Sequence, residues 1–599
     1  MIKKILAIFV LLAALAFGAY EDAPQDGTSA HPWQIANATD WALFVTDMNE
    51  TVAHRNDYVI VTADINFAGA TVEPVCGGNE WAGNFDGQNH TFSNLVIAYA
   101  GNFSSNNHIG LFAKTTTGLS AEGYITIENL NITNATVVGT SPNAGYSSYC
   151  GILFGENSYN SVISNVVITN PTIQLTQDNA GMNGYVGPLG GSSHGNIPDC
   201  YSVGGTAKIE HLTGGTAYLG GLVGLQCAGS AANQNSWIKN CGSTTVLGHI
   251  NSGASDTLVC IGGITGSLWP IYDTSATPDI LNYTAVFDSV FAGTINYVSG
   301  GPVRCGGIVA EAGKSSSLGG PTYGGFARGC DNLGTITITN TGTTCTVGGI
   351  VGNAYGGLNW NDNHCVGNIT VTSGTHTQTG GLAGLFSNSA FTNSSYTGTI
   401  TMSASGTIGI LGGCFGALET GAYVDSCYAL VNFSTGSSGL LMNVGGFAGM
   451  STGAGISNCF ARGTVLCSGS STLAYNSWGG LISQINGGYV SNCYAVFGLN
   501  TGNSALEELL IGLNTGPTPI YGCFGNTTVA GFGDTPDTFD GIAATTTQMQ
   551  TKSTYENAGW DFSTTTGKWE IKEGSYPELI YPYPKVGNSF TNYKSGGKQ

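Results

Sequence analysis

The chain has 599 residues, 93 of them Gly, and its 16 Lys and Arg are outnumbered by 36 Asp and Glu. A formal net charge of −20 argues against nucleic acid or an anionic membrane surface as a partner. With 41% hydrophobic and 10% aromatic residues, the chain is also too apolar to be a disordered acidic protein. We therefore expect a folded protein in which glycine has a structural role.

The chain starts with MIKK, followed by the apolar run ILAIFVLLAALAF. A cationic start and a short apolar run are typical of a signal peptide, and Ala16 and Gly18 are the small residues expected before a cleavage site. No later segment has the length and apolarity of a transmembrane helix. The sequence predicts an extracellular or cell-surface protein with no transmembrane span in the mature chain.

A glycine-rich phrase then recurs along the chain. GGLVG at 220 returns as GGITG, GGIVA, GGIVG, GGLAG, GGCFG, GGFAG and GGLIS. Repeats spaced by 20 to 50 residues are typical of solenoids, propellers and arrays. The second glycines of the phrases lie 32 to 44 residues apart and are Gly221, Gly263, Gly307, Gly349, Gly381, Gly413, Gly446 and Gly480.

The segments between the phrases alternate Thr with Ile or Val, as in GTITITNTGTTCTV at 334, and contain few strong helix formers. They predict an all-β fold, an elongated parallel β-solenoid (β-helix) of about ten to twelve coils with N- and C-terminal caps. Each coil should rise about 4.8 Å, with no substantial α-helix after the signal peptide. At each phrase we expect a corner, where glycine permits a positive φ or a close approach between coils, followed by a buried apolar pair.

Both ends of an open solenoid expose unpaired strand edges, so each end needs a cap. The aromatic-rich segments 31–60 and 549–581 are the two candidates. Their large side chains include Trp33, Trp41, Leu43, Phe44, Trp560, Phe562, Trp569 and Tyr576. The expected organisation is a signal peptide at 1–18, an N-terminal cap and first coils at 19–107, a repeat solenoid at 108–525, a C-terminal capping segment at 526–582 and a flexible tail at 583–599.

Four of the phrases, GLVG at 221, GIVG at 349, GLAG at 381 and GFAG at 446, resemble the Gly-Leu-hydrophobic-Gly phrase of the GLUG-repeat family of secreted bacterial proteins. Segments 32–44, 58–67, 83–97 and 549–581 are also similar to the first and last segments of such proteins. This resemblance covers most of the mature chain and implies a β-solenoid in an adhesin-like surface protein. The family includes immunoglobulin-A-peptidase-like chains, but no residues of this chain support a peptidase.

Eight of the 16 cysteines share one place in the repeat, after a polar residue or glycine and often before an aromatic residue. Stacking in register would keep their Cβ atoms about 4.8 Å apart, farther than the roughly 3.8 Å that a disulfide needs. We therefore expect a buried ladder in which most of the thiols are reduced. Its predicted members are Cys200, Cys241, Cys330, Cys365, Cys427, Cys459, Cys493 and Cys523.

The sequence shows no clear catalytic group. β-Helical enzymes that cleave polysaccharides need clustered carboxylates, but residues 190–525 contain only 13 Asp and Glu, and the adjacent Glu507 and Glu508 are one of few close pairs. His364 beside Cys365 suggests a metal ligand or a nucleophile, yet the ladder place of Cys365 favours a packed structural pair. The sequence therefore predicts no catalytic residue, no metal and no cofactor.

The coils between residues 221 and 349 are 42 to 44 residues long, compared with 32 to 34 in the coils that follow. We expect the surplus to leave the solenoid as loops on one side. Aromatic residues in these loops either bind a sugar or a protein partner, or else seal the bases of the loops against the core. They are Trp269, Tyr272, Tyr283, Tyr323, Tyr355 and Trp360.

Three functions are consistent with these patterns. The first is a secreted or cell-surface protein that binds, adheres or spaces without catalysis, with a glycan or a host or cell-surface protein as its partner. The second is a carbohydrate-active β-helix enzyme, a polysaccharide lyase or hydrolase, whose acids would come together from different coils. The third is an ice- or crystal-binding face made of threonine ladders such as TITIT at 335, which requires regularly spaced threonines on one flat, exposed side.

Overall fold

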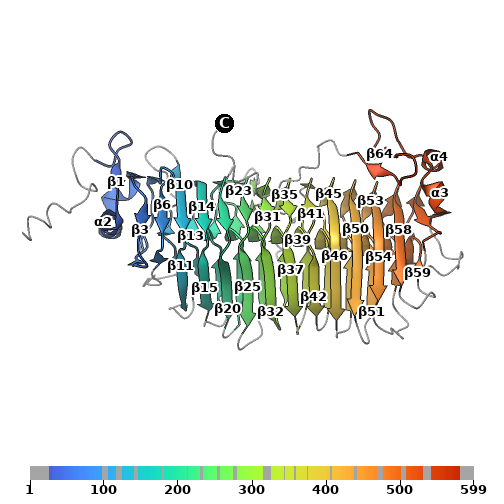
Figure 1. Ribbon diagram of the computed structural model, residues 1–599, viewed down its shortest axis with the longest axis horizontal. Helices are drawn as coiled ribbons and strands as arrows, with labels where there is room; N and C mark the ends of the chain where they lie inside the picture. Colours follow the sequence, from blue (N-terminus) through green and yellow to red (C-terminus); the bar gives the residue numbers. More distant parts are fainter. Residues whose placement is uncertain are drawn as a thin grey trace, which may run out of the picture.

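The chain forms a parallel β-solenoid capped at both ends (Figure 1). The computed structural model describes residues 26–77, 79–97, 106–116, 124–140, 146–177, 181–211, 214–229, 234–251, 257–273, 280–313, 325–340, 342, 344–356, 359–373, 376–404, 408–436, 441–467, 477–500, 507–529 and 541–580. The predicted signal peptide and the predicted tail at 583–599 lie outside these residues. Within the described residues two sheets contain 12 strands each, which gives 12 coils with a strand in both sheets and confirms the predicted fold.

One coil shows how the four large sheets arise. β21 (Thr216–Gly220) belongs to sheet I, β22 (Val223–Cys227) to sheet II and β23 (Ser236–Lys239) to sheet III. β24 (Gly242–Ser243) and β25 (Val246–Asn251) both belong to sheet IV. Each strand pairs in parallel with its counterpart in the next coil, as in the pairs Val223↔Thr265, Ile238↔Val286 and Leu247↔Ile295. The chain therefore places equivalent residues of successive coils side by side.

The glycine phrase lies at the bend between sheets I and II. There the backbones approach so closely that side chains do not fit. A Cβ atom on Gly220 would lie 1.8 Å from the carbonyl oxygen of Val223, and one on Gly221 would lie 1.9 Å from that of Gly263 in the next coil. The apolar pair that follows, Leu222 and Val223, is fully buried, as predicted. Of the two predicted roles for these corner glycines, close approach is the one that the structure shows.

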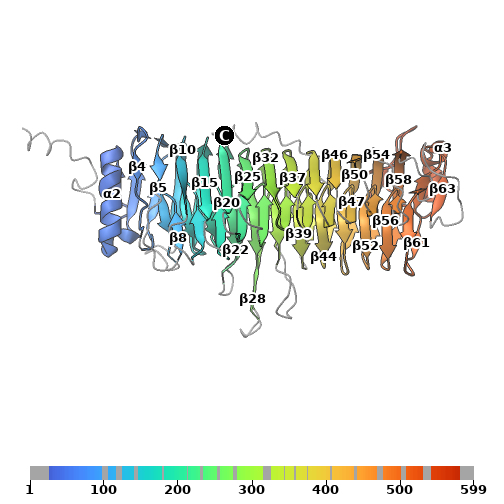
Figure 2. The same ribbon diagram turned by 90° about the horizontal axis from the view of Figure 1, so that it is seen from below.

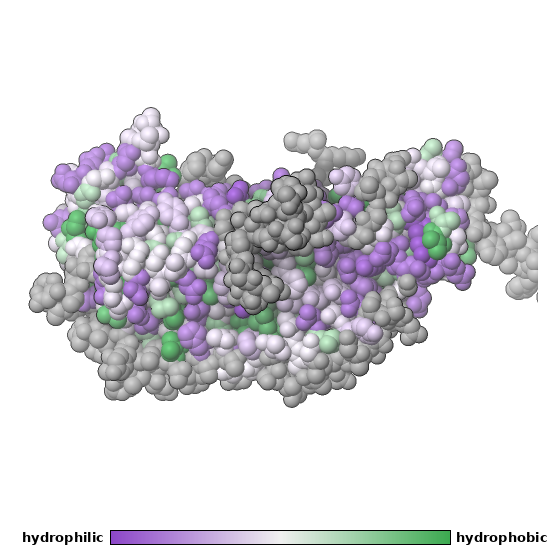
Figure 3. Space-filling view, turned by 180° about the vertical axis from the view of Figure 1, so that it is seen from behind, coloured by the Kyte–Doolittle hydropathy of each residue, from purple (hydrophilic) through white to green (hydrophobic). Residues whose placement is uncertain are grey.

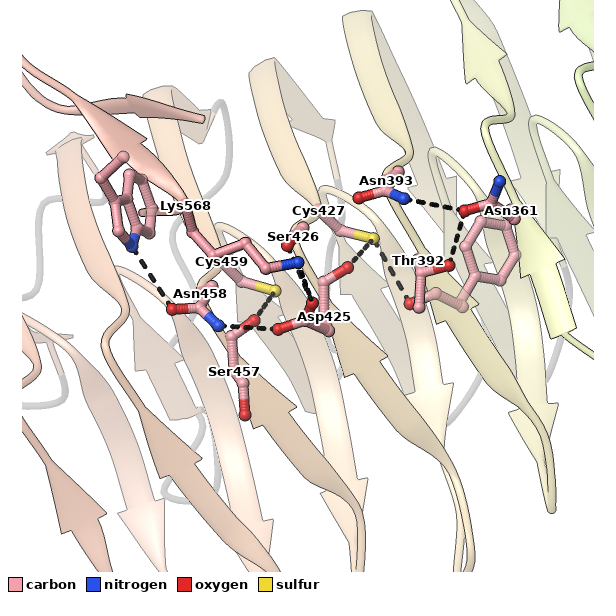
Figure 4. A network of polar contacts seen from close by, with 12 residues as sticks. Asn361, Thr392, Asn393, Asp425, Ser426, Cys427, Ser457, Asn458, Cys459 and Lys568 are labelled. Atoms are coloured by element: carbon pink, nitrogen blue, oxygen red, sulfur yellow. Dashed lines mark hydrogen bonds and ion pairs between the residues drawn. The ribbon is translucent and has the colours of Figure 1, made fainter. Parts of the chain in front are cut away.

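Positive φ angles occur instead at a second bend, between sheets III and IV. Asn240, Asp288 and Asp362 have φ values of 54°, 47° and 58°, in the left-handed region that Asn and Asp tolerate better than most residues. In later coils, side chains at and beside this bend form a polar ladder to which Asn361, Asn393, Asp425 and Asn458 contribute (Figure 4). In that ladder Asn458 Nδ2 donates to Asp425 Oδ1 at 2.7 Å.

The cysteine ladder lies directly after these bends, and its side chains satisfy backbone groups. The thiol of Cys241 accepts a hydrogen bond from the backbone N–H of Cys200, with N and Sγ 3.3 Å apart, and donates to the carbonyl oxygen of Lys239 at 3.2 Å. In the next coil Ser289 accepts from the N–H of Cys241 and donates to the carbonyl of Phe287. The ladder position thus needs a small side chain that can both accept and donate.

Seven of the eight predicted ladder residues occupy this position, but the prediction for Cys365 is wrong. Asp331 pairs with His364, which places Asn363 level with Cys330 and leaves Cys365 two residues farther along. Asn363 accepts from the N–H of Cys330 at 3.2 Å, the same role that Cys and Ser have in other coils. The ladder therefore includes three residues that are not cysteine, namely Ser289, Asn363 and Ser394.

Fifteen cysteines have described side chains, and all of them are buried free thiols. Burial is the main cause that raises the pKa values of the ladder thiols Cys200 and Cys330 above their ordinary value. These thiols are therefore protonated at neutral pH. A protonated thiol is the form that can donate to the carbonyl oxygen at the bend.

The N-terminal cap contains the helix α2 (Ala38–Glu50), so the expectation of no substantial α-helix is wrong. Asn37 caps it by accepting hydrogen bonds from the N–H groups of Thr39 and Asp40. Trp41 is buried at the end of the core, with its ring centroid 5.2 Å from that of Phe92. The helix thereby covers the apolar end of the first coils.

The C-terminal segment covers the side of the last coils. It contains α3 (Thr546–Met549), α4 (Lys552–Glu556) and the antiparallel strands β64 (Trp569–Glu570) and β65 (Glu578–Leu579). It packs on an outward column of aromatic rings from sheet IV, where Tyr555 contacts Phe524 at 4.7 Å between ring centroids. Lys568 Nζ also forms an ion pair with Asp425 at 3.3 Å (Figure 4).

The ladder leads to a prediction about substitution. Cys241→Ala removes the acceptor for the N–H of Cys200, so we expect it to lower the free energy of unfolding by about 1–3 kcal/mol. Cys241→Ser keeps both hydrogen bonds and should cost less. Urea unfolding followed by circular dichroism measures both. Equal losses for Ala and Ser, or a loss for Ser289→Cys as large as for Ser289→Ala, would contradict the role that we assign to the ladder side chain.

Candidate functional site

Three successive coils extend the chain at the same corner, between sheets II and III. The connections run from β22 to β23, from β27 (Thr265–Trp269) to β30 (Thr284–Phe287) and from β34 (Val309–Ala312) to β35 (Phe326–Arg328). In later coils the same corner is short, with three residues between Tyr355 and Asn359. All three long connections therefore leave the solenoid at one corner, as the sequence predicted, and Figure 2 shows β28 (Ile271–Asp273) extending from that side of the rod. We call this corner the insertion side.

The middle insertion begins and ends as a β-hairpin. β28 (Ile271–Asp273) pairs antiparallel with β29 (Ile280–Asn282), and residues 274–279 between them lie outside the described chain. Two hydrogen bonds tie the base of the hairpin to the preceding insertion: Asn282 Nδ2 donates to the carbonyl of Gly229 at 2.6 Å, and the N–H of Tyr283 donates to Asn235 Oδ1 at 2.9 Å. The projection is therefore anchored to a rigid scaffold.

Two of the predicted aromatic residues support the bases of these insertions. Trp269 is half-buried and meets Tyr218 edge-on, with ring centroids 5.6 Å apart. Tyr283 is also half-buried and lies 5.8 Å from the ring of Phe326. Both rings thus contact other rings of the fold, as the sealing role requires.

The remaining predicted residues are divided between other environments. Trp360 is fully buried and stacks on Phe391 in the core, so no ligand can reach its ring and its assignment to a binding surface is wrong. Tyr355 is half-buried, and burial is the main cause that raises its pKa. The backbone of Tyr272 pairs with that of Leu281 in the hairpin, but its side chain is not among the described ones. Tyr323 lies outside the described residues.

On the outer side of the bend between sheets I and II, buried and half-buried charges are paired. His108 Nε2 lies 2.8 Å from Glu156 Oε2, and Lys114 Nζ lies 3.7 Å from Glu156 and 3.1 Å from Glu80. Burial opposes ionisation of Glu156, but the hydrogen bond and charge of His108, together with Lys114, hold its pKa at about 2. This carboxylate therefore remains charged and engaged with its cations.

Sequence reasoning missed this cluster and the ring ladder that continues it. The ring of His108 stacks on Tyr149, which stacks on Tyr185, which stacks on Tyr218, with centroids 4.6 to 5.1 Å apart. A signal was present, because each ring stands two residues before the first glycine of HIG, YCG, YVG or YLG. Since neighbouring rings cover each other's faces, the ladder offers few free faces on which a sugar could stack.

A smaller acidic group lies on the outer side of the bend between sheets III and IV. Burial raises the pKa of Asp331 to about 6, and His364 partly offsets this shift. His364 Nε2 lies 3.2 Å from Asp362 Oδ1, and its Nδ1 lies 2.8 Å from Ser395 Oγ. Because successive strand residues face opposite sides, His364 contacts these outer groups while Cys365 is buried in the core. The two residues therefore do not form a packed pair.

The other predicted candidates for chemistry remain apart from these groups. Glu507 and Glu508 form β59 (Glu507–Glu508), which pairs with β55 (Ser477–Gly479), and the side chain of Glu507 is outside the description. Within the described part of the chain, no three His, Cys, Asp or Glu side chains are grouped so as to hold a metal ion. The described helices also include none that is long and apolar enough to cross a membrane.

No family model matches the chain, and no curated protein matches it significantly. Among solved structures, the crystal structure of a "putative immunoglobulin A1 protease" from Bacteroides ovatus is similar at 20% identity and a TM-score of 0.34. The match covers 56% of this chain and 87% of that one. At this level of similarity, function has to be argued from the residues of the chain itself.

Two carboxyl groups with opposite pKa shifts predict opposite effects of pH on stability. The pKa of Asp331 in the folded protein is about 6, above its ordinary value of 3.8. Its carboxylate therefore destabilises the folded state, fully above about pH 6 and progressively less as the pH falls. Below 3.8 the group is protonated in both the folded and the unfolded state, and this cost is absent. Asp331→Asn should therefore raise the melting temperature at pH 8, with a gain that shrinks towards zero near pH 4.

The matched variant is Glu156→Gln. The pKa of Glu156 in the folded protein is about 2, below its ordinary value of 4.5. The carboxylate therefore stabilises the folded state in full above pH 4.5, and this stabilisation is lost as the pH falls towards 2. We expect Glu156→Gln to lower the melting temperature at pH 7. Thermal denaturation across pH 3 to 8 compares both variants with the wild type, and a Glu156→Gln effect that grows as pH falls would show that the assigned ion pairs are wrong.

Proposed function

We propose that this protein is a secreted or cell-surface protein that binds a partner or spaces it from a surface without catalysing a reaction. The observation that carries the proposal is the placement of long insertions at one corner of three successive coils of a rigid rod (Figure 2). Binding residues in proteins concentrate on loops that a rigid scaffold positions. At about 4.8 Å per coil, 12 coils would hold such loops on a rod roughly 55 Å long.

The surface around the insertions supports a polar partner. Figure 3 shows the side from which β28 projects, where the described side chains beside the grey residues are mostly hydrophilic to neutral, with small hydrophobic patches among them. A glycan or a hydrophilic patch on a cell-surface protein would fit this environment. The resemblance of the glycine phrases to GLUG repeats agrees with an adhesin-like role outside the cell.

The alternative, a carbohydrate-active β-helix enzyme, depends mainly on Asp331. A carboxyl group with a pKa of about 6 suits general acid catalysis. Asp288 and Asp362 lie at the bends of the two neighbouring coils. The negative charge of Asp362 helps to raise the pKa values of both Asp331 and Asp288. However, Asp362 already forms an ion pair with His364. The positive φ angle at the bend, which Asn and Asp tolerate, is also sufficient to explain why Asp288 and Asp362 occur there.

The proposal is tested by shortening the hairpin. Replacing residues 271–281 with three residues, the length found between Tyr355 and Asn359, leaves the anchoring residues Asn282 and Tyr283 in place. This change should abolish binding to glycan arrays or to immobilised cell-surface proteins while the melting temperature is nearly unchanged. The control shortens residues 468–476, which connect β54 (Phe460–Cys467) to β55 at a different corner.

Two results would contradict the proposal. One is equal binding by the wild type and the hairpin variant. The other is release of reducing ends from polysaccharides by the wild type, with loss of that release in Asp331→Asn, which would favour the enzyme.

A further inference from the structure

The side of the rod opposite the insertions carries a flat array of hydroxyl groups. Figure 1 shows the strands of sheet IV side by side on this face, and Figure 2 shows them as an even row along the opposite edge from the projections. The strands concerned are β32 (Thr294–Ser299), β37 (Thr335–Asn340), β42 (Ile369–Ser373), β46 (Ser395–Ala404), β50 (Tyr428–Gly436) and β54. We call the outward residues that these strands contribute to the three columns named below the hydroxyl face.

Register pairing arranges these residues in columns. One column runs through Asn296, Thr337, Thr370, Thr401 and Ser434 in five successive coils. The columns on either side contain Thr294, Thr335, Asn368, Thr399, Asn432 and Thr464, and Val298, Thr339, Thr372 and Ser403. All of these side chains are exposed or half-buried.

The array is regular in two directions. Neighbouring strands lie about 4.8 Å apart, and alternate residues on one strand lie about 6.7 Å apart. The intervening residues, such as Ile336, Ile338 and Val371, are buried in the core and hold the face in place. Because threonine is branched at Cβ, its χ1 angle is restricted, so each hydroxyl and methyl group has a nearly fixed position before any ligand arrives.

The chemistry of the face limits what it could bind. The columns contain no charged residue, although the whole chain has a net charge of −20, so a mineral or ionic polymer would find no complementary charge. They also contain no aromatic residue, which argues against stacking on the sugar rings of a crystalline polysaccharide. What remains is a neutral, rigid lattice made mainly of hydroxyl and methyl groups, with the side-chain amides of Asn296, Asn368 and Asn432 in the same columns.

We propose that the hydroxyl face binds ice. Hydroxyl groups can join an ordered water lattice as donors and acceptors, and the repeat distances of the face are on the scale of those between oxygen atoms in ice surfaces. Many weak contacts made together give strong retention on a growing crystal, even where one contact is weak. This proposal uses a different surface from the insertion side and does not depend on its function.

The test measures thermal hysteresis and ice recrystallisation with the purified full chain. We expect the wild type to show both activities and Thr370→Lys, at the centre of the face, to lose most of them, because a long charged side chain holds neighbouring hydroxyls away from the lattice. Thr370→Val keeps the shape of the side chain and should retain more activity than Thr370→Lys. Melting temperatures establish that each variant is folded.

The matched control is Gln174→Lys, an exposed position on the same sheet that lies outside the hydroxyl face. It should behave like the wild type. Absence of hysteresis in the wild type, retention of hysteresis in Thr370→Lys, or an equal loss in Gln174→Lys would overturn the assignment. Binding of the wild type to microcrystalline cellulose without thermal hysteresis would also overturn it, in favour of a polysaccharide surface.

Discussion

The stacking of coils in register is the constraint on which the rest of this structure depends. Each coil pairs with the coils on both sides, so a position that is crowded in one coil is crowded in all of them. The second glycine of the repeated phrase shows this most clearly, because a side chain on Gly221 would meet the carbonyl of Gly263, and one on Gly263 would meet that of Gly307. At the bend between sheets III and IV, the Cys, Ser or Asn of one coil accepts the N–H of the preceding coil.

The same register separates the rod into sides with different properties. The bend between sheets I and II is lined by stacked rings and paired charges, and the C-terminal segment packs over the aromatic column of the last coils. Two sides remain for partners: the insertion side, where three coils extend the chain, and the hydroxyl face, where threonines repeat in two directions. Of these two sides, the insertion side is the one whose connections vary in length from coil to coil, and the hydroxyl face is the one that is regular enough to match a lattice.

The repeat made the fold predictable, because glycine spacing and alternating Thr and Ile specify corners and strands without further context. Cys365 was misplaced because alignment by residue type assumed that only Cys fills the ladder, whereas Asn363 makes the equivalent hydrogen bond. Trp360 looked like a loop residue in NWNDN, but the short corner of its coil starts a strand at Asn359 and turns its ring into the core. The helix α2 was missed although Trp41, Phe44, Val45 and Met48 follow helical spacing after the cap Asn37. The charges that meet at Glu156 come from different coils, so no local pattern announced them.

Counting thiols is the most direct test of the stacking register. If equivalent residues stack with parallel side chains, the cysteines act as hydrogen-bonding packing residues and not as cross-links, although the chain is predicted to be exported. A thiol reagent should then modify few or none of the 16 cysteines in the native protein and nearly all of them in denaturant without reductant. A denatured count that falls short by several pairs, restored by reductant, would show disulfides and contradict the register described here.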